Sequence, residues 1–292
     1  MTKHKDAIDL DAVPLSDRLR LPLGPVSMAG LDPSATPGYP GDGKDDAERY
    51  TAALAPKLSD LQEMLYAAGR SVPEKAPRVL VVLQGMDTSG KGGVIRHAIG
   101  LVDPQGVDMT AFKAPTAEER RHHYLWRIRN ALPGPGKIGI FDRSHYEDVL
   151  VVRVDSLVPE DVWSKRYDEI NEFEAGLVAD GYRLIKCMLN VSFDEQRQRL
   201  AERLADPSKY WKYNPGDVDA RLKWPAYMEA YEAALEKCNT EAAPWYVIPS
   251  DRKWYRNWAV AELLREALSG MGLAWPAAEF DVATEQQRVA AS

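Results

Sequence analysis

The sequence predicts an α/β fold built on a parallel, doubly wound sheet of about five strands. Short apolar runs recur along the chain, and charged segments with helical spacing separate them. A glycine-rich segment, "GMDTSGKG", follows the first of these runs directly. With 292 residues and 45% hydrophobic content, the chain can bury one large core, so a single main domain is expected.

The chain is predicted to begin with an arm and a helix that precede the first strand. Residues 1–45 are rich in Pro, Gly and Asp and lack a sustained apolar period. We expect them to form an arm that lies over the surface or is partly mobile, with no part in chemistry. From Leu54 to Leu65, four leucines recur at helical spacing, which predicts an amphipathic helix over 45–69.

The main domain is predicted to span 46–270 and to alternate strands with helices. Strands are expected at 79–83, 109–112, 138–141, 184–189 and 245–248. Helices are expected at 117–131, 159–179, 194–204 and 254–268. Ser192 and Glu195 have the spacing of a capping box at the start of the third of these helices. Residues 271–292 are expected to be a C-terminal tail whose end, "ATEQQRVAAS", frays.

Composition excludes several classes of protein. Only Cys187 and Cys238 occur, without the paired spacing of a zinc site, so a reducing cytoplasm is the expected compartment. The first residues lack the apolar run of a signal peptide, and no segment approaches the ~20 apolar residues that span a bilayer, so no membrane association is expected. A net charge of −7 argues against a nucleic-acid partner. Any site for a polyanion must therefore be a local basic groove.

The segment after the first strand fits a phosphate-binding loop, G-x-x-x-x-G-K, at Gly85, Gly90 and Lys91. Glycines let backbone N–H groups curl around phosphate oxygens, and the helix that follows adds positive potential at its N-terminus. Lys91 can reach the terminal phosphates, and Gly92 and Gly93 extend the phosphate-binding segment into the helix. The alternative is an ordinary glycine-rich turn.

The metal ligand of this loop is unusual. Gly92 stands where such loops normally have the Ser or Thr that contacts Mg²⁺. Asp87 lies inside the loop, where a carboxylate would repel a bound anion unless it held a metal ion against the phosphate oxygens. Alternatively, Asp87 only caps the turn by accepting hydrogen bonds from backbone N–H groups.

A second acidic strand end supports the metal interpretation. Asp142 follows the predicted strand 138–141 and could complete a Mg²⁺ site with Asp87 at the carboxyl edge of the sheet. Arg143 comes next, and its planar guanidinium suits contact with the oxygens of a transferring phosphoryl group. The alternative is a surface turn in which the two residues form an ion pair. For His145, an orienting hydrogen bond is expected rather than acid catalysis.

Basic residues gather locally although the protein is acidic. The segment 197–223 carries seven Lys or Arg against four Asp or Glu, and Arg199 and Arg203 share one helical face. These two arginines and Lys209 would suit a lid that closes over phosphate chains, although a solvated basic helix is the alternative. Lys113, after the second strand, is expected near the same edge of the sheet. This surplus exceeds the needs of one nucleotide and favours a long polyanionic phosphate donor.

Four motifs together resemble the polyphosphate kinase 2 family over about 54–268: "GMDTSGKGG", "FDRSHYEDVLVVRV", "RLAERLADPSKYWKYNPGD" and "PWYVIPSDRKWYRNW". The resemblance implies a P-loop kinase fold of the thymidylate-kinase-like type with a helical lid, a requirement for Mg²⁺ that Mn²⁺ could also meet, and a homo-oligomer. It also implies reversible transfer between inorganic polyphosphate and a nucleotide, with ADP converted to ATP and AMP as a further acceptor.

The resemblance also assigns roles by position. The family has Gly after the loop lysine, as here, which implies that two carboxylates rather than a hydroxyl hold the metal. The implied metal ligands are Asp87 and Asp142, the implied phosphate ligands are Lys91 and Arg143, and the implied lid arginines are Arg199 and Arg203.

Two other functions fit the same motifs. One is a nucleotide or nucleoside kinase with ATP as donor, and the other is a P-loop protein that only binds polyphosphate or nucleotide. Two acids beside an anion speak against mere binding. Conversion of ADP to ATP with polyphosphate as sole donor would separate the three.

Overall fold

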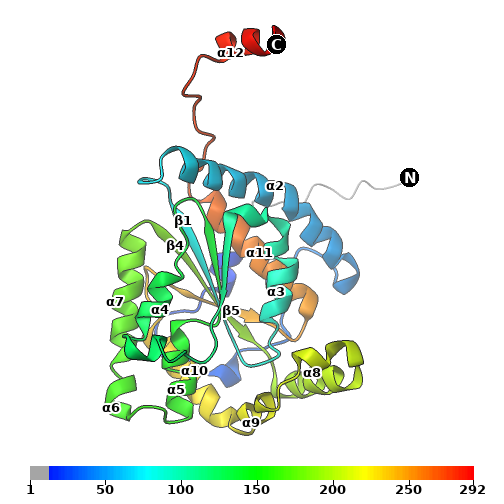
Figure 1. The fold of residues 1–292 in the computed structure, drawn as a ribbon. Helices are drawn as coiled ribbons and strands as arrows, with labels where there is room; N and C mark the ends of the chain where they lie inside the picture. Colours follow the sequence, from blue (N-terminus) through cyan, green and yellow to red (C-terminus); the bar gives the residue numbers. More distant parts are fainter. Residues whose placement is uncertain (1–12) are drawn as a thin grey trace, which may run out of the picture.

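The computed structural model describes residues 13–292. Five strands form one sheet in the order β2-β3-β1-β4-β5, and every neighbouring pair is parallel. Helices cover both faces of this sheet (Figure 1). The predicted α/β fold is confirmed, and each of its strands lies where the sequence placed it. The strands are β1 (Arg78–Gln84), β2 (Val107–Ala111), β3 (Ile138–Asp142), β4 (Tyr182–Asn190) and β5 (Trp245–Pro249).

Strand β1 shows how the sheet separates two hydrophobic cores. Val79, Val81 and Leu83 contribute to one core, and Leu80 and Val82 contribute to the other. All five are almost completely buried, and each such aliphatic side chain contributes about 1.5–3 kcal/mol to stability. The first core is completed mainly by α2 (Lys44–Ser71), α3 (Lys91–His97) and α11 (Lys253–Ser269), and the second by α4 (Leu125–Asn130), α7 (Arg166–Ala179) and α10 (Trp224–Lys237).

The N-terminal arm is tied to the free edge of β5. Arg20 and Tyr246 form an antiparallel bridge, and the Leu21 N–H donates to the Trp245 carbonyl at 2.9 Å. Helix α1 (Leu15–Leu19) packs into the first core, while Leu21 packs into the second. The arm thereby covers a strand edge that would otherwise expose unpaired backbone groups. Residues 1–12 of the expected arm lie outside the described part of the chain.

Two predicted helices are interrupted, and one tail prediction is wrong. The segment predicted as a helix at 117–131 holds only a 3₁₀ turn, Glu119–Arg121, before α4, because His122 and His123 after the turn are exposed and offer no apolar face to bury. The helix predicted at 159–179 is divided into α6 (Glu160–Trp163) and α7. At the C-terminus, α12 (Val282–Ala290) replaces the expected frayed end and stands away from the domain (Figure 1).

A capping hydrogen bond at its N-terminus, which was not predicted from the sequence, stabilises helix α12. Asp281 is its N-cap, and its side chain accepts a hydrogen bond from the Thr284 N–H at 2.6 Å. The corresponding prediction at the third helix is confirmed, since Ser192 Oγ accepts from the Glu195 N–H at 3.1 Å. Capping bonds of this kind act within one turn, so they shape even a helix that packs against nothing.

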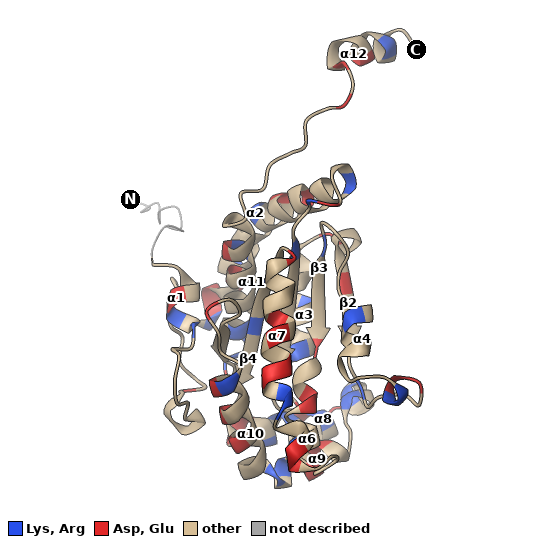
Figure 2. Cartoon of the chain, turned by 90° about the vertical axis from the view of Figure 1, so that its left-hand side faces the viewer, with Lys and Arg blue, Asp and Glu red and all other residues tan. Residues whose placement is uncertain are grey.

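The carboxyl end of the sheet is covered by the basic segment. Helix α8 (Phe193–Ala205), a 3₁₀ helix (Pro207–Lys212) and α9 (Gly216–Leu222) follow β4 and lie at this end, where charges of both signs gather (Figure 2). Helix α5 (Val151–Val154) and the 3₁₀ turn His145–Asp148 follow β3 toward the same end. Among residues 13–292, no helix is long and apolar enough to cross a membrane.

Candidate active site

The phosphate loop connects β1 to α3 and folds back on its own lysine. Lys91 Nζ donates to the Gly85 carbonyl at 2.8 Å and lies 3.5 Å from the Met86 carbonyl oxygen. Gly90, which precedes α3, has φ 111°, a conformation that side chains rarely adopt. The Arg256 guanidinium also fills the space that a side chain at Gly90 would need. The segment is therefore a closed loop before a helix N-terminus, which is the geometry that the motif predicts.

The first turn of α3 presents open space on its outer side. A side-chain carbon added at Gly92 would meet no atom within 4 Å, and Gly92 is exposed. No acidic residue lies in this turn, so the helix itself has no carboxylate that offsets the positive potential of its N-terminus. Gly93 instead lies against Arg256. Of the two glycines, Gly92 is thus the better placed to let an anion approach the backbone.

Asp87 and Arg143 meet in front of this loop. Arg143 Nη2 donates to Asp87 Oδ1 at 2.6 Å, and the two side chains are 37% and 24% exposed. Arg143 has φ 65° and its N–H donates to the Leu83 carbonyl at 3.0 Å, so the ladder between β1 and β3 holds the arginine in a strained backbone conformation. The two residues singled out from separate motifs are therefore neighbours.

The charges around Asp87 favour its ionised form. Burial raises the pKa of this carboxyl, but Lys91 and Arg143 outweigh burial and bring the pKa below its ordinary value. For Arg143, burial lowers the pKa, while Glu147 and Asp87 more than compensate and raise it. Both groups are charged at neutral pH. The alternative, in which Asp87 only accepts hydrogen bonds from backbone N–H groups, does not account for its bond to the Arg143 side chain.

Glu147 is a member of the site that the sequence reading missed. The 3₁₀ turn His145–Asp148 returns this residue toward Arg143. When the Gln84 amide is oriented so that its oxygen accepts from Ser144, its nitrogen donates to Glu147 Oε1 at 3.1 Å. Burial raises the pKa of Glu147, and the nearby charges of Arg143 and Lys91 only partly oppose that rise. The signal was present as the Glu of "RSHYE", but only the turn makes it face the loop.

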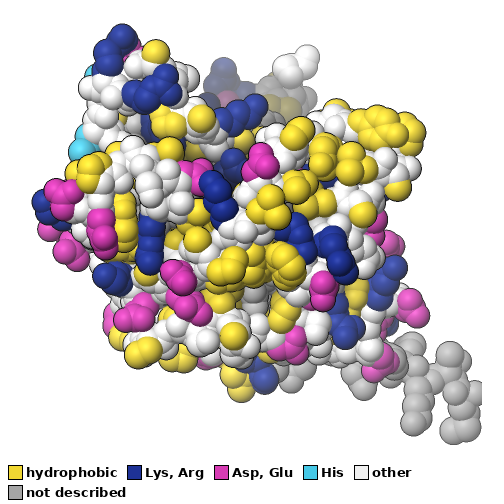
Figure 3. Space-filling model, turned by 90° about the horizontal axis from the view of Figure 1, so that it is seen from below, with side chains coloured by type: hydrophobic (Ala, Val, Ile, Leu, Met, Phe, Trp, Pro, Cys, Tyr) yellow, Lys and Arg dark blue, Asp and Glu magenta, His cyan; other side chains and the backbone are white. Residues whose placement is uncertain are grey.

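A cavity of ≈ 450 Å³ opens beside the phosphate loop and leads away toward α10. Its inner wall carries Asp87, Arg143 and Glu147, and its outer wall carries an ion pair between Lys223 and Asp155 at 2.7 Å. Tyr227 and Tyr231 add aromatic surface. Seen from this end, the molecule shows Lys and Arg side chains among hydrophobic ones (Figure 3). Its charged lining holds more acidic side chains than basic ones, so a nucleotide phosphate here would need Arg143, Lys223 or a bound cation as its partner.

The acidic side chains fit a divalent metal that phosphate helps to hold. Within the described residues, no group of three or more His, Cys, Asp or Glu side chains is arranged to bind a metal. Mg²⁺ in kinases needs only one or two carboxylates, because substrate phosphates and water complete its shell. Asp87 offers one ionised carboxylate in the lining of the cavity beside the loop. The residues present therefore fit Mg²⁺ bound together with a phosphate chain.

Asp142, Lys113 and Lys209 are predicted site residues that do not line this cavity. Asp142 ends β3 opposite Leu83 and is half-buried beside Arg143, but the described wall of the cavity does not include it. Lys113 is exposed and borders a different cavity of ≈ 540 Å³ at the β2 edge. Lys209 is exposed and pairs with Asp206 at 2.9 Å. The structure brings none of these three into contact with the phosphate loop.

The two arginines of α8 that were predicted to belong to a lid, Arg199 and Arg203, differ in surroundings. Arg203 is 24% exposed and donates to Asp217 Oδ2 at 3.1 Å and to the Lys212 carbonyl at 2.8 Å. Its charge adds to the larger effects of Lys91 and Arg143, which lower the pKa of Asp87 against the opposing effect of burial. Arg199 is 5% exposed and bonds to protein groups with all its nitrogens. As placed here, Arg199 has no N–H left for phosphate, in contrast to the expected lid role.

A buried charged network supports the turn that carries Glu147. His145 Nε2 lies 3.1 Å from Glu174 Oε1, and Lys186 Nζ donates to Glu174 Oε2 at 2.6 Å. The Tyr146 hydroxyl donates to Glu174 Oε1 at 2.7 Å. Burial raises the pKa of Glu174, but Lys186 and His145 reverse this and bring it below its ordinary value. His145 therefore has an orienting contact and lies away from the cavity, completely buried.

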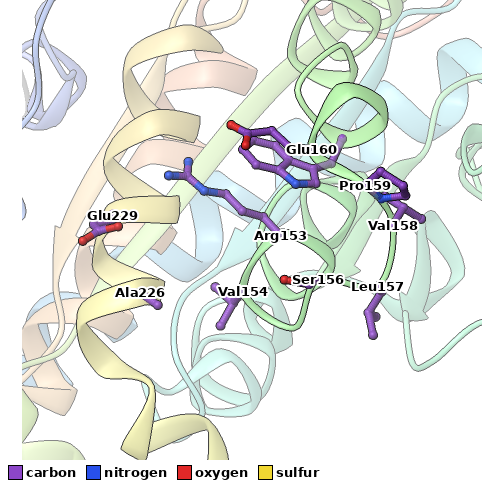
Figure 4. A pocket seen from close by; sticks show the side chains of 10 residues that line it. Arg153, Val154, Ser156, Leu157, Val158, Pro159, Glu160, Ala226 and Glu229 are labelled. Carbon is purple, nitrogen blue, oxygen red and sulfur yellow. The ribbon is translucent and has the colours of Figure 1, made fainter.

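A second cavity, of ≈ 600 Å³, lies between α5, α6 and α10 (Figure 4). Arg153, Glu160 and Glu229 contribute charges of both signs to its wall. The Arg153 guanidinium lies 4.9 Å from the centre of the Trp163 ring. Its walls come from these helices and their connections rather than from the phosphate loop. Its size alone does not make it the reaction site.

Comparison with known proteins places the whole domain in one family. Residues 43–273 match the sequence pattern of the family described as "Polyphosphate kinase 2 (PPK2)". The chain belongs to the polyphosphate kinase 2 family. An AMP/ADP-polyphosphate phosphotransferase of Meiothermus ruber is 48% identical over 88% of this chain and 94% of its own length. An ADP-polyphosphate phosphotransferase of Rhodopseudomonas palustris is 40% identical over 75% of this chain and 78% of its own.

A solved structure agrees with this assignment. The crystal structure of polyphosphate kinase 2 from Arthrobacter aurescens TC1 superposes with a TM-score of 0.91 at 49% identity, covering 96% of this chain and 98% of that one. The protein therefore has the P-loop kinase fold of the polyphosphate kinase 2 family. The resemblance inferred from the four motifs is confirmed.

Proposed function

We propose that this protein transfers a phosphoryl group between inorganic polyphosphate and a nucleotide, with ADP as the main acceptor, ATP as its product and AMP as a further acceptor. The observation that carries the proposal is the pairing of Asp87 with Arg143 in front of a closed phosphate loop that has Gly92 in place of a hydroxyl residue. The names of the Meiothermus ruber and Rhodopseudomonas palustris relatives support the choice of substrates.

The chain's own groups account for most of the work of phosphoryl transfer, which is positioning and charge neutralisation. Backbone N–H groups at the start of α3, with Lys91, bind the phosphates to be transferred. Arg143 stands between the loop and the cavity, where it can neutralise charge on the transferring group. The nucleotide occupies the cavity of ≈ 450 Å³, so its terminal phosphate faces the loop.

Mg²⁺, or Mn²⁺ in its place, is the proposed cofactor. Asp87 would hold it, with Asp142 as the second carboxylate ligand from the neighbouring strand end. When bound, the metal supplies charge neutralisation for the phosphate oxygens. The absence of a hydroxyl at Gly92 and the ionised state of Asp87 support this set of ligands.

The segment 197–223 is the proposed lid, with Arg203 and Lys209 as its phosphate-binding cations. Arg203 is already held near the cavity by Asp217, which supports contact with the transferring group after closure.

We also propose a cytoplasmic homo-oligomer, for which the exposed side chains of Phe193, Trp211 and Leu222 offer apolar contact surface. Lys113 remains a proposed phosphate contact.

One donor assay tests the proposal. Purified protein should convert ADP to ATP with polyphosphate as the only donor, and excess chelator should abolish the reaction. Phosphorylation of nucleotides from ATP but not from polyphosphate would identify an ordinary nucleotide kinase instead. Binding of polyphosphate without turnover from either polyphosphate or ATP would identify a binding protein.

A further inference from the structure

Side chains from outside the phosphate loop bind three successive loop carbonyls. Gln196 Nε2 donates to the Asp87 carbonyl at 3.1 Å. Arg199 Nη1 donates to the Thr88 carbonyl at 2.9 Å and to the Ser89 carbonyl at 3.2 Å. Gln196 and Arg199 both belong to α8, so one helix holds the backbone of the loop at three neighbouring residues.

Arg199 is completely committed to this contact. Besides the two loop carbonyls, its Nη2 donates to the carbonyls of Ser250 at 2.6 Å and Asp251 at 2.9 Å, and its Nε donates to Glu195 Oε1 at 2.7 Å. A guanidinium has five N–H groups, and these bonds account for all of them. The side chain therefore joins α8, the phosphate loop and the connection from β5 to α11 at one buried point.

Arg256 supports the same loop from α11. Its Nη1 donates to the Ser89 carbonyl at 3.0 Å, and its guanidinium lies against Gly90 and Gly93. Burial, and then the charge of Arg199, lower the pKa of Arg256 to about 9. The side chain still carries its charge at neutral pH. Two buried arginines thus add positive potential behind a loop that receives an anion.

These bonds decide which way the loop backbone faces. In a trans peptide the C=O and N–H groups point in opposite directions, so carbonyls held toward α8 and α11 turn the following N–H groups toward the other side. The Ser89 N–H there donates to the Met86 carbonyl at 3.0 Å, so the N–H groups of Thr88 and Gly90 are the ones that can meet a phosphate. Thr88 has φ 64°, which a residue with a branched side chain rarely adopts. A strained conformation of this kind persists only where the surroundings fix it. The bond from Arg199 to the Thr88 carbonyl is one such restraint.

We propose that Gln196, Arg199 and Arg256 are positioning residues that hold the loop carbonyls away from the phosphate and so present the N–H groups of Thr88 and Gly90 to it. The inference rests on the proposed function but concerns the loop, not the substrate. It replaces the expected phosphate contact of Arg199 with an indirect role. It also links the loop to the proposed lid, because most of α8 lies within the segment 197–223.

The test compares two conservative changes in buried arginines. Arg199→Lys keeps a positive charge but cannot make five bonds in a fork. Arg265→Lys, on α11, alters an arginine that bonds to Glu262 and serves as the control for general loss of stability. Hydrogen exchange of the peptide that covers 85–93 is measured in both variants and the wild type without substrate, alongside kcat and KM with polyphosphate and ADP.

We expect Arg199→Lys to speed exchange in this peptide and to lower kcat about 30-fold or more, with KM for ADP little changed, because misplacement of binding groups costs rate rather than acceptor affinity. Arg265→Lys should leave both measurements near the wild type. Unchanged loop exchange in Arg199→Lys would overturn the proposal, as would a rise in polyphosphate KM alone, which would make Arg199 a direct ligand.

A second variant covers the case in which Arg199→Lys fails to fold. Gln196→Met keeps the size of the side chain but loses the donor to the Asp87 carbonyl, and the same local rise in exchange is expected. Wild-type exchange at 85–93 in this variant would also overturn the proposal. The exchange measurement needs no turnover, so the proposed role can stand or fall separately from polyphosphate use by the wild type.

Discussion

Arg143 Nη2 lies 2.6 Å from Asp87 Oδ1 although 56 positions separate the two residues in the chain. The contact exists because β1 and β3 are neighbours in register, with Leu83 opposite Asp142, so the segments after both strands start from the same edge. It keeps a carboxylate ionised and a guanidinium fixed beside the phosphate loop. In the proposed reaction the guanidinium would balance charge on the reacting oxygens directly, and the carboxylate would do so by holding a metal ion.

Replacement of Asp87 by Asn should lower turnover at least ~100-fold, because the neutral amide removes both a metal ligand and the charge partner of Arg143. Initial rates of ATP formation from polyphosphate and ADP provide the measurement. Asp108→Asn is a matched control, since Asp108 forms a comparable ion pair with Lys137 at 2.8 Å on the edge strand β2. A folded Asp87→Asn protein with wild-type turnover would remove Asp87 from the site.

The raised pKa of Glu147 predicts that the difference in stability between the wild type and Glu147→Gln depends on pH. A carboxyl whose folded-state pKa lies above its unfolded value stabilises the fold at low pH and loses that contribution as pH rises through the folded pKa. Glu147→Gln keeps the shape but does not titrate. Relative to the wild type, the variant should therefore gain in Tm as pH rises from below the ordinary glutamate range to neutrality.

Thermal unfolding of both proteins over this pH range checks the prediction for Glu147. All other groups titrate in both proteins, so the difference in Tm isolates this carboxyl. A constant difference would mean that burial does not raise its pKa. A difference that moves in favour of the wild type with rising pH would show that Arg143 and Lys91 dominate instead.

Loss of Arg203 should affect chemistry as well as docking. We expect Arg203→Ala to lower kcat and not only the apparent affinity for polyphosphate, because an arginine over the transferring group gains contact as charge redistributes. Arg197→Ala is the control on the same helix, since Arg197 is 73% exposed and pairs with Asp194 at the surface. If Arg203→Ala raises only KM for polyphosphate, Arg203 is a docking residue.

Local sequence patterns predicted the parts of the site that lie next to a strand. Gly85, Gly90 and Lys91 form one continuous motif, and Asp87 and Arg143 each come within four residues of a strand end. The parallel sheet then brings such residues to one edge. Those predictions needed only the alternation of strands and helices, which the apolar runs made visible.

Sequence patterns did not predict contacts that depend on tertiary packing. Arg199 shares one helical face with Arg203, and this suggested that it binds phosphate. It instead bonds to the carbonyls of Thr88 and Ser250, which come from distant segments of the chain. Glu147 was missed for a similar reason, because a 3₁₀ turn rather than a regular helix directs it to the cavity. Neither environment has a signature within a short window of the chain.

Asp142 provides a test of acceptor choice. It ends β3 beside Arg143, and its carbonyl accepts from the Phe112 N–H at 3.0 Å, which fixes its backbone. If its carboxylate helps to hold a metal against the acceptor's terminal phosphate, ADP should fit better than AMP, because its β-phosphate reaches further toward the loop. An Asn at this position offers a weaker neutral oxygen and an N–H that can donate directly to a phosphate.

We therefore expect the wild type to phosphorylate ADP faster than AMP, and Asp142→Asn to lower ADP turnover while shifting the ratio of rates toward AMP. Paired initial rates with polyphosphate as donor give this ratio. Because the backbone of Asp142 is held by the ladder between β2 and β3, the substitution changes the ligand and not the course of the chain. An unchanged ratio of ADP to AMP rates would show that the choice is made elsewhere, most simply by the cavity walls at Lys223 and Tyr227, which lie further from the loop.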